Sequence, residues 1–516
     1  MRGPMKIAAI GLAVLAAAFL SASCGNPAPR KLIRDLLPIE GHPLVSFRIL
    51  VRIGSANDPS GQEGLARLTW SMLAQGGSRL MSLREIAEKF TPMAADLTVD
   101  VDKEMAVFAG TVHRDNLDRY YALLRDMLLD PGFREEDFTR LKADQLAFLE
   151  KTLAANMDEA FGKEILNLML YAGHPYGHPE AGTAESVARL TLEDVKAFYK
   201  EYFVQGNIVL GLAGGYPADF PDKVAADFTR LPERFTPRLA LPPARAPRGL
   251  EFAIADKTTP ATAISMGFPI ALTPADKDFF ALWVAGAHFG EHRQSLSLLY
   301  QKIREERGQN YGDYAYISHF IQGRDKFPAP NHARQQQYFS IWIRPVGNAN
   351  RHFVIRQALR ELKKLVEDGL TEERFELVRS YLLNYTKLYA QTLGERLGWR
   401  MDSHYYGYGD GDFLAAAQAA LPKLSLTDVN KAVRKYLNFA SLCIAVVTQD
   451  AEALKADLLA NAPSPVKYAN PAMPPEVLRE DAVIQEYPLA VQGDKITTAP
   501  AADFFRKPGL PGKQER

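Results

Sequence analysis

The sequence is poor in cysteine, in net charge and in long apolar runs. Cys24 and Cys443 are the only cysteines in 516 residues, which excludes a disulfide framework. Basic and acidic residues both number 61, so the formal net charge is zero and no surface suited to nucleic acid is indicated. Beyond residue 24, no stretch is long and apolar enough to span a bilayer. The remainder, 47% apolar and 24% charged, is typical of a globular protein with several cores.

The first 24 residues have the pattern of a secretory signal. Arg2 and Lys6 supply positive charge, Ile7 to Leu20 is an apolar run, and small residues precede Cys24. We therefore predict a lipoprotein signal peptide over residues 1–24, with the Cys24 thiol as the lipidation site. The fit to a lipobox is imperfect, because the usual leucine is displaced by one position to Leu20.

These features predict an exported, periplasmic protein that contacts a bacterial membrane only through its N-terminal lipid. Gly25 follows the cysteine where aspartate would favour retention in the inner membrane, so the outer membrane is favoured. Plain secretion, with Cys24 unmodified, is the alternative.

An internal repeat indicates two homologous halves. The segment Leu190–Val195 is followed by a helical stretch and an apolar strand, and the segment Leu424–Val429 is followed by the same pattern. The repeat and a proline-rich stretch predict four parts after the signal peptide. These are an N-terminal half over 25–235, a linker over 236–249, a C-terminal half over 250–465 and a tail over 466–516, in which we expect Asp481 to Phe505 to pack as short strands.

Hydrophobic periodicity predicts an α+β fold with helices packed on mainly antiparallel sheets. Leu44 to Ser55 has the composition of a strand, and the run from Asp96 to Val112 predicts two strands joined by a turn near Asp102-Lys103. Helical spacing is found over Gln62–Leu73, and Thr191 is a plausible N-cap for a later helix.

Several motifs occur in an order that resembles the pitrilysin/insulinase-type (inverzincin) metallopeptidases. They are VRIGSANDPSGQEGLARLTWSMLAQGGS in the first half, then HPYGHPEAGTAESV and LTLEDVKAFYKEYF. The resemblance covers most of residues 40–465. It implies two homologous halves that form a clam-like chamber, and a zinc site in which HxxEH supplies two histidine ligands and a glutamate base.

That zinc site is degenerate in this sequence. The HxxEH frame falls on Arg67-Leu68-Thr69-Trp70-Ser71, so Arg67, Trp70 and Ser71 stand where the ligands and the base are expected. Arginine stays protonated and cannot ligate a metal. The family's third ligand, a glutamate, falls at about Ala147 or Phe148, and Glu150 is half a turn away. We therefore expect no metal in this chain.

A literal HxxEH string occurs elsewhere, at His288, Glu291 and His292. On one helix the two histidines would share a face. However, the repeat places the string at a turn, and Gly290 weakens a helix there. We expect a capping or turn role, and we keep zinc binding at this string as the weaker alternative.

His174 and His178, in HPYGHP, form a second pair of possible ligands. The prolines and the glycine around them favour a rigid structural loop instead.

The second half contains LLYQKIREERGQNYGDYAYIS, which resembles the family segment L-R-x-x-R-G-x-x-Y. The resemblance assigns a catalytic arginine and tyrosine to Arg304 and Tyr311. The guanidinium would hold a substrate carbonyl, and the phenol would donate a hydrogen bond to the developing oxyanion. The other interpretation is that Arg304 pairs with neighbouring glutamates and Tyr311 is a core residue.

The zinc ligands are lost, whereas the pair Arg304 and Tyr311 is retained, and this combination favours one function. The chain is expected to be the non-metal subunit of a heterodimer, whose HxxEH-bearing partner carries the zinc and which cleaves short unfolded peptides. A peptide would bind by adding a strand to a sheet edge within Asp96–Val112. The alternative is a catalytically inactive scaffold or peptide-binding protein of the same fold.

Overall fold

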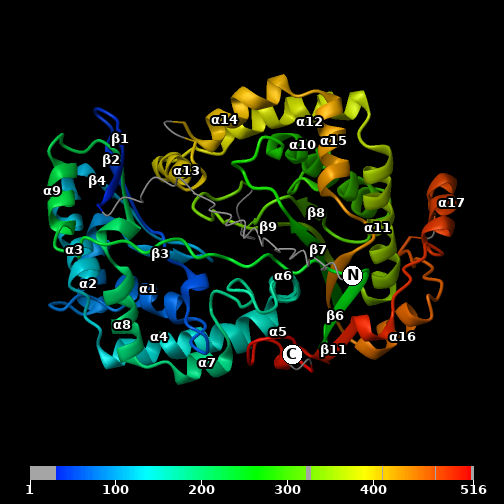
Figure 1. Cartoon of the computed structure of the whole chain (residues 1–516), viewed down its shortest axis with the longest axis horizontal. Helices are drawn as coiled ribbons and strands as arrows, with labels where there is room; N and C mark the ends of the chain where they lie inside the picture. The colour runs from blue at the N-terminus through cyan, green and yellow to red at the C-terminus, as the bar shows by residue number, and fades with distance from the viewer. Residues whose placement is uncertain (1–30, 321–326, 409–410, 471, 513–516) are drawn as a thin grey trace, which may run out of the picture.

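The computed structural model describes residues 31–320, 327–408, 411–470 and 472–512, so the signal peptide and Cys24 lie outside the described residues. Two β-sheets, each accompanied by its own helices, form two halves of the molecule, the first blue to green and the second green to red in Figure 1. None of the helices in the described ranges combines the length and hydropathy that crossing a membrane requires.

The first half is built on a five-stranded sheet with strand order β1-β5-β2-β4-β3. The strands are β1 (Ile33–Pro38), β2 (Leu44–Val51), β3 (Thr98–Val101), β4 (Ala106–His113) and β5 (Ile208–Gly214). The helices are α1 (Leu65–Gln75), α2 (Leu83–Phe90), α3 (Leu117–Leu129), α4 (Glu135–Ala147), α5 (Ala154–Asn156), α6 (Asp158–Leu170), α7 (Ala184–Arg189), α8 (Leu192–Tyr202) and α9 (Phe220–Phe228). Only the pair β1 and β5 is parallel.

The second half repeats this sheet, with strand order β11-β6-β10-β7-β9-β8. Its strands are β6 (Leu250–Asp256), β7 (Ala261–Ile270), β8 (Asp313–Tyr316), β9 (Gln337–Gly347), β10 (Leu442–Thr448) and β11 (Ile496–Pro500). Its helices are α10 (Phe279–Gly290), α11 (Arg351–Asp368), α12 (Glu372–Tyr385), α13 (Leu393–Tyr406), α14 (Phe413–Ala420), α15 (Leu426–Tyr436), α16 (Ala451–Leu459) and α17 (Pro475–Ile484). Apart from β11, the order matches that of the first sheet strand for strand, so the predicted α+β fold of two homologous halves is confirmed.

The repeated sequence segments begin the same helix in each half. Thr191 caps α8 and accepts a hydrogen bond from the backbone N–H of Asp194, whose carboxylate bonds back to the backbone N–H of Thr191. Ser425 and Asp428 form the same capping box at the start of α15. Each box satisfies backbone donors that the first helical turn leaves free, which explains why both helices begin at this point of the repeat.

Each half also lends one helix to the other. Helix α6 of the first half packs on β7 and β10 of the second sheet, and α13 of the second half packs on β2 and β5 of the first sheet. Gly211 on β5 permits the close approach of α13, because a Cβ there would stand 2.8 Å from the sulfur of Met401. The packing around each sheet is therefore completed by a helix that belongs to the other half of the chain.

A buried polar network joins the halves at the turn between β3 and β4, where Asp102, Lys103 and Glu104 follow one another. Asp102 receives a bidentate pair of hydrogen bonds from Arg334 of the second half, the Nε–Oδ2 distance being 2.9 Å. The Lys103 ammonium lies 2.8 Å from the Glu180 carboxylate. The Asp102 and Arg334 side chains are at most 4% exposed, so the charges are compensated by one another rather than by water.

Glu104 completes this network. Its carboxylate accepts hydrogen bonds from the backbone N–H of Gln335 at 2.7 Å and from the hydroxyl of Tyr405, on α13, at 2.5 Å. Each residue of the turn therefore has a partner: Lys103 bonds within its own half, and Asp102 and Glu104 bond to the other half.

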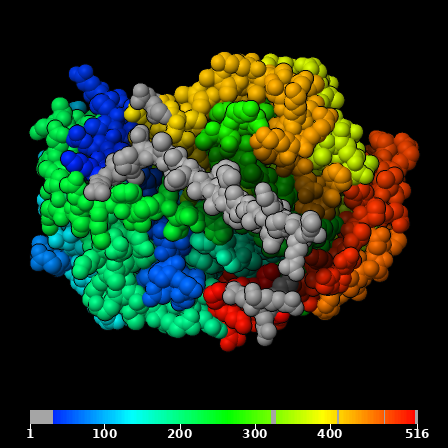
Figure 2. Space-filling model, in the orientation of Figure 1, coloured from blue at the N-terminus to red at the C-terminus, as the bar shows by residue number. Residues whose placement is uncertain are grey.

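The C-terminal tail returns to the first half, as the red segment at the lower edge of Figure 2 shows. Backbone N–H groups of Ala184 and Glu185 donate to the carbonyls of Phe505 and Arg506, and Phe505 packs edge-on against Phe161 at 5.7 Å. The expectation of short strands from Asp481 to Phe505 was wrong in part, because Asp481 to Ile484 end helix α17 (Pro475–Ile484) and only Ile496–Pro500 joins a sheet.

We expect Asp102→Asn to lower the free energy of unfolding by about 3–5 kcal/mol, because the buried Arg334 would lose its bidentate counter-charge and keep only Glu180 at 3.5 Å, which Lys103 also pairs with. Equilibrium unfolding in urea measures this. Asp222→Asn is the matched control, since it breaks an exposed ion pair with Arg34 that is worth roughly 0–1 kcal/mol. Equal stability of the two variants would contradict a holding role for the buried pair.

Acid should weaken the same network. Burial opposes ionisation of the Glu180 carboxyl, but Lys103 and Arg334 outweigh burial and lower the pKa of Glu180 to about 2. Its folded pKa is thus below the unfolded value of 4.5, so its contribution is present above pH 4.5 and is lost as the pH falls toward 2. Glu180→Gln should accordingly reduce the loss of unfolding free energy between pH 5 and pH 3, measured by urea titration at each pH.

The comparison of the wild-type chain with Glu180→Gln separates the effect of Glu180 from that of Glu164. Burial raises the pKa of Glu164 to about 7, so its contribution to the unfolding free energy changes with pH in the opposite direction. An unchanged pH slope in Glu180→Gln would show that the Lys103–Glu180 pair contributes nothing to acid sensitivity.

Candidate functional site

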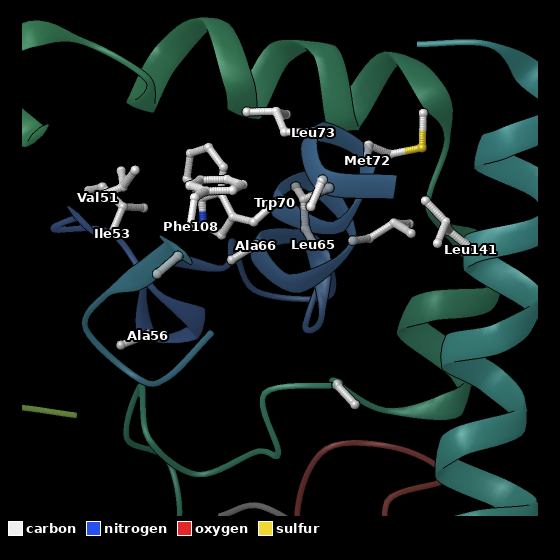
Figure 3. Close-up of a cluster of buried hydrophobic side chains, with 14 of the residues drawn as sticks. Val51, Ile53, Ala56, Leu65, Ala66, Trp70, Met72, Leu73, Phe108 and Leu141 are labelled. Carbon is white, nitrogen blue, oxygen red and sulfur yellow. The ribbon is translucent and has the colours of Figure 1, made fainter. Parts of the chain in front are cut away.

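The helix expected to carry HxxEH is α1, and its middle is part of the hydrophobic core. Trp70 is fully buried, with Phe108 of β4 and Phe198 of α8 edge-on at 6.3 and 5.7 Å. Figure 3 shows its indole among Leu65, Leu73 and Phe108. An ionisable base at this position would have to be buried among hydrocarbon side chains, which is unfavourable. The position at which the family carries its base therefore contributes to core packing in this chain.

The positions of the first and third expected ligands are also together in space. The Arg67 guanidinium lies over the ring of Phe148, 4.6 Å from its centroid, which is cation–π geometry. Phe148 begins a π-helical turn, Phe148–Leu153, that continues α4. The contact supports the alignment of both positions with a metal site, and it fills that site with a cation and a benzene ring.

Ser71 occupies the second ligand position and is partly exposed. The residues at these positions therefore do not fit a zinc ion, because none of Arg67, Ser71 and Phe148 is a metal ligand of the kind zinc selects. Across the ranges of the chain that the structure describes, there is also no cluster of three or more His, Cys, Asp or Glu side chains placed to hold a metal.

The literal HxxEH string is divided by a helix end. Helix α10 stops at Gly290, and Glu291 has extended backbone angles, so His288 and His292 do not share a helix face. The Nδ1 atom of His292 is hydrogen-bonded with the hydroxyl of Tyr316, and that of His288 accepts from Arg374 at 3.4 Å. Burial lowers the pKa of His292 to about 3 and that of His288 to about 4, so both rings are neutral near pH 7.

The HPYGHP segment is a rigid loop, as expected. The His174 ring accepts a hydrogen bond from the backbone N–H of Tyr176 at 2.9 Å, and the carbonyl of His178 accepts one from Lys103. Burial lowers the pKa of His178 to about 4. The loop therefore supports the polar network between the halves.

Arg304 and Tyr311 lie on the surface of the second half, around the start of edge strand β8. Arg304 is on a π-helical turn, Tyr300–Glu305, and its guanidinium stacks over the ring of Tyr300 at 4.5 Å. Tyr311 is 77% exposed, which is unusual for a tyrosine and rules out the core role that was the alternative.

The segment that presents this pair is firmly anchored. Arg307 is buried and forms ion pairs of 2.9 Å with both Glu480 and Asp481 of α17. Asp313 is fully buried at the start of β8 and accepts a hydrogen bond from Asn310 at 2.7 Å. Sequence reasoning missed these supports, because Glu480 and Asp481 belong to the tail, and Asp481 begins the segment in which short strands were expected.

The edge predicted to take a peptide strand is shorter than expected. Strand β3 is the edge of the first sheet and its residues alternate between exposed and half-buried. Strand β4, its neighbour, is mostly buried. The exposed edge within Asp96–Val112 is therefore Thr98–Val101.

Comparison with known proteins agrees with this geometry. Residues 39–183 match the model of the insulinase family, peptidase family M16, and residues 189–382 match the model described as the peptidase M16 inactive domain. A relative from Helicobacter pylori, described as a non-peptidase homolog, is 22% identical over 424 residues, which is 79% of this chain and 89% of the relative.

Solved structures share the fold. The peptidase M16 inactive domain from Pseudomonas fluorescens superposes with a TM-score of 0.70 at 20% identity, covering 81% of this chain and 96% of that one. The periplasmic protease PqqL from Escherichia coli superposes with a TM-score of 0.62 at 14% identity, covering 80% of this chain but only 44% of PqqL. With adjoining matches to both the N-terminal peptidase domain and the inactive domain, the chain belongs to the insulinase family of peptidases, family M16.

Proposed function

We propose that this chain is the non-metal subunit of a two-chain zinc peptidase and that it supplies Arg304 and Tyr311 to the active site of an HxxEH-bearing partner. One contrast carries the proposal. Where the family has metal ligands, Arg67 lies over Phe148, whereas Tyr311 is held out from the surface, 77% exposed. A chain that had lost catalysis altogether would have no need of a solvated tyrosine on an anchored segment.

The chemistry of the pair suits hydrolysis of a peptide bond. Zinc on the partner would supply Lewis acidity and an activated water. The Arg304 guanidinium would hold a substrate carbonyl through charge-assisted hydrogen bonds, and its stacking on Tyr300 restricts its orientation beforehand. The Tyr311 hydroxyl would donate a hydrogen bond to the oxygen that gains negative charge.

The edge strand β3 gives a means of binding the substrate. Strand β3 ends the first sheet and is partly exposed, whereas β8, which ends the second sheet just after Tyr311, has buried side chains. An extended peptide added to such an edge gains backbone hydrogen bonds without a sequence requirement. This favours short unfolded peptides as substrates, bound in a chamber closed by the second chain.

The requirement for a second chain has support from length. This fold covers 44% of PqqL, which is described as a periplasmic protease. Two chains of the present size would together match such an enzyme. The predicted lipid on Cys24 would hold the assembly at the periplasmic side of a membrane, the outer membrane being favoured.

A second candidate function is an inactive scaffold or peptide-binding protein. The Helicobacter pylori relative described as a non-peptidase homolog favours it. The two candidates differ in their partner: affinity purification of the lipidated chain should recover a homologue with intact HxxEH in the first case, and stable partners without that motif in the second.

Arg304→Ala should lower the kcat of the assembled peptidase on an unstructured peptide by about 10²–10³-fold, and Tyr311→Phe by a similar factor, because each removes a donor to developing charge. Hydrolysis of a quenched fluorescent peptide by the purified two-chain complex measures this. Arg84→Ala and Tyr202→Phe are matched controls, because Arg84 is an exposed arginine of the first half and Tyr202 a partly exposed tyrosine there. Unchanged turnover in both Arg304→Ala and Tyr311→Phe would refute the proposal.

The isolated chain should contain well under one zinc per molecule, because the positions of the family ligands hold no ligand. Elemental analysis of the chain beginning at Gly25, after dialysis against a weak chelator, measures this. His288→Ala should leave the value unchanged, since His288 and His292 are on opposite sides of a helix end. Stoichiometric zinc that disappears in His288→Ala would instead make the chain a metallopeptidase in its own right.

A further inference from the structure

The second half contains an aromatic cavity that none of the functions above uses. It has a volume of about 130 Å³ and lies between α10, the end of β8 and α13. Eight phenylalanine, tyrosine and tryptophan side chains of the described residues line it. Five of these, from three separate parts of the chain, pack against one another: Phe279, Trp283, Tyr389, Trp399 and Phe413. Its size is close to the roughly 150 Å³ of an engineered apolar cavity that binds benzene, so a small organic molecule would fit.

The aromatic side chains form a continuous group. Trp283 lies 5.5 Å from Phe413 and 6.3 Å from Tyr389, measured between ring centroids. Trp399 stacks on Phe413 at 5.3 Å and on Tyr389 at 6.0 Å. Stacking covers part of these ring faces, and the aromatic surface that remains on the cavity wall carries the partial negative charge of its rings.

A carboxylate also lines this aromatic cavity. Glu291, just beyond α10, keeps part of its surface accessible and borders the cavity. It receives a hydrogen bond from the backbone N–H of His292, and burial raises its pKa to about 7. No lysine, arginine or histidine of the described residues forms an ion pair with it within 4.0 Å. A second acid on the wall, Asp402, is by contrast satisfied by two hydrogen bonds from Asn331.

We propose that this cavity binds a small organic monocation of the alkylammonium or trimethylammonium class. The aromatic surface of Trp283, Trp399 and Phe413 on the cavity wall would contact its positively charged end, and Glu291 would supply the counter-ion. Burying an acid without a cation in a hydrocarbon pocket is costly, and a bound cation removes that cost. Aromatic faces around a carboxylate are the arrangement that recognises quaternary ammonium groups.

The preference for a cation over a neutral molecule of the same shape follows from the same two features. An apolar group would gain contact with the rings but would leave Glu291 without a partner. A trimethylammonium group gains both the contact and the charge pairing. This inference does not depend on the proposed role of Arg304 and Tyr311, because neither residue borders the cavity.

Choline and 3,3-dimethyl-1-butanol test the proposal, since they have nearly the same shape and differ in charge. Binding to the whole chain would be followed by titration calorimetry and by tryptophan fluorescence, because Trp283 and Trp399 line the cavity. We expect choline to bind at least about tenfold more tightly than the neutral alcohol. Glu291→Gln should weaken choline binding by a similar factor and leave the affinity for the alcohol unchanged.

Glu150→Gln is the matched control, because it removes an exposed acid that borders a different groove, in the first half. It should leave both affinities unchanged. Equal affinity of the wild-type chain for choline and the alcohol would overturn the proposal, and so would the absence of choline binding. If Glu291→Gln does not fold, the comparison of the two probes on the wild-type chain still decides the matter.

Discussion

The charged turn between β3 and β4 is the constraint on which the rest of the structure depends. Asp102, Lys103 and Glu104 are three consecutive ionisable residues at a buried place. Their partners come from the HPYGHP loop and Glu180 after it, from the segment that precedes β9 and from α13. Because a buried charge without its partner is strongly destabilising, the network fixes how the two sheets face each other. In the same arrangement, α6 packs on the second sheet and α13 packs on the first.

This fixed relation explains how a lost active site is compatible with a preserved fold. Helix α1 no longer has to present ligands, so Trp70 fills the core and Arg67 stacks on Phe148. The second half has kept an anchored segment around Arg304 and Tyr311, tied through Arg307 to α17. The first half has lost its metal ligands, whereas the second half keeps Arg304 and Tyr311 on an anchored segment. This combination is what would be expected of a chain that contributes to a site completed by another molecule.

Sequence reasoning succeeded where the determining interactions are local. The helix starts at Thr191 and Ser425 could be predicted, because a capping box depends only on hydrogen bonds between residues three apart in the sequence. The turn at Asp102-Lys103 was readable from strand alternation on either side. It failed where distant segments meet: the role of Arg334, the swapped helices and the aromatic cavity all depend on contacts between residues more than 50 positions apart. The tail was misassigned for the same reason, since Arg307 and Arg360 hold Glu480 and Asp481 of α17.

By itself, the sequence determined the repeat, the α+β class, the family resemblance and the loss of the metal ligands, because each follows from the identity and spacing of residues along the chain. The repeat and Gly290 also predicted the interruption of the literal HxxEH string. Only the tertiary structure decided that Tyr311 is solvated and that Glu291 borders an aromatic cavity. The physical reason is that exposure and charge pairing are properties of the space around a side chain, and that space is built from segments which the sequence lists far apart.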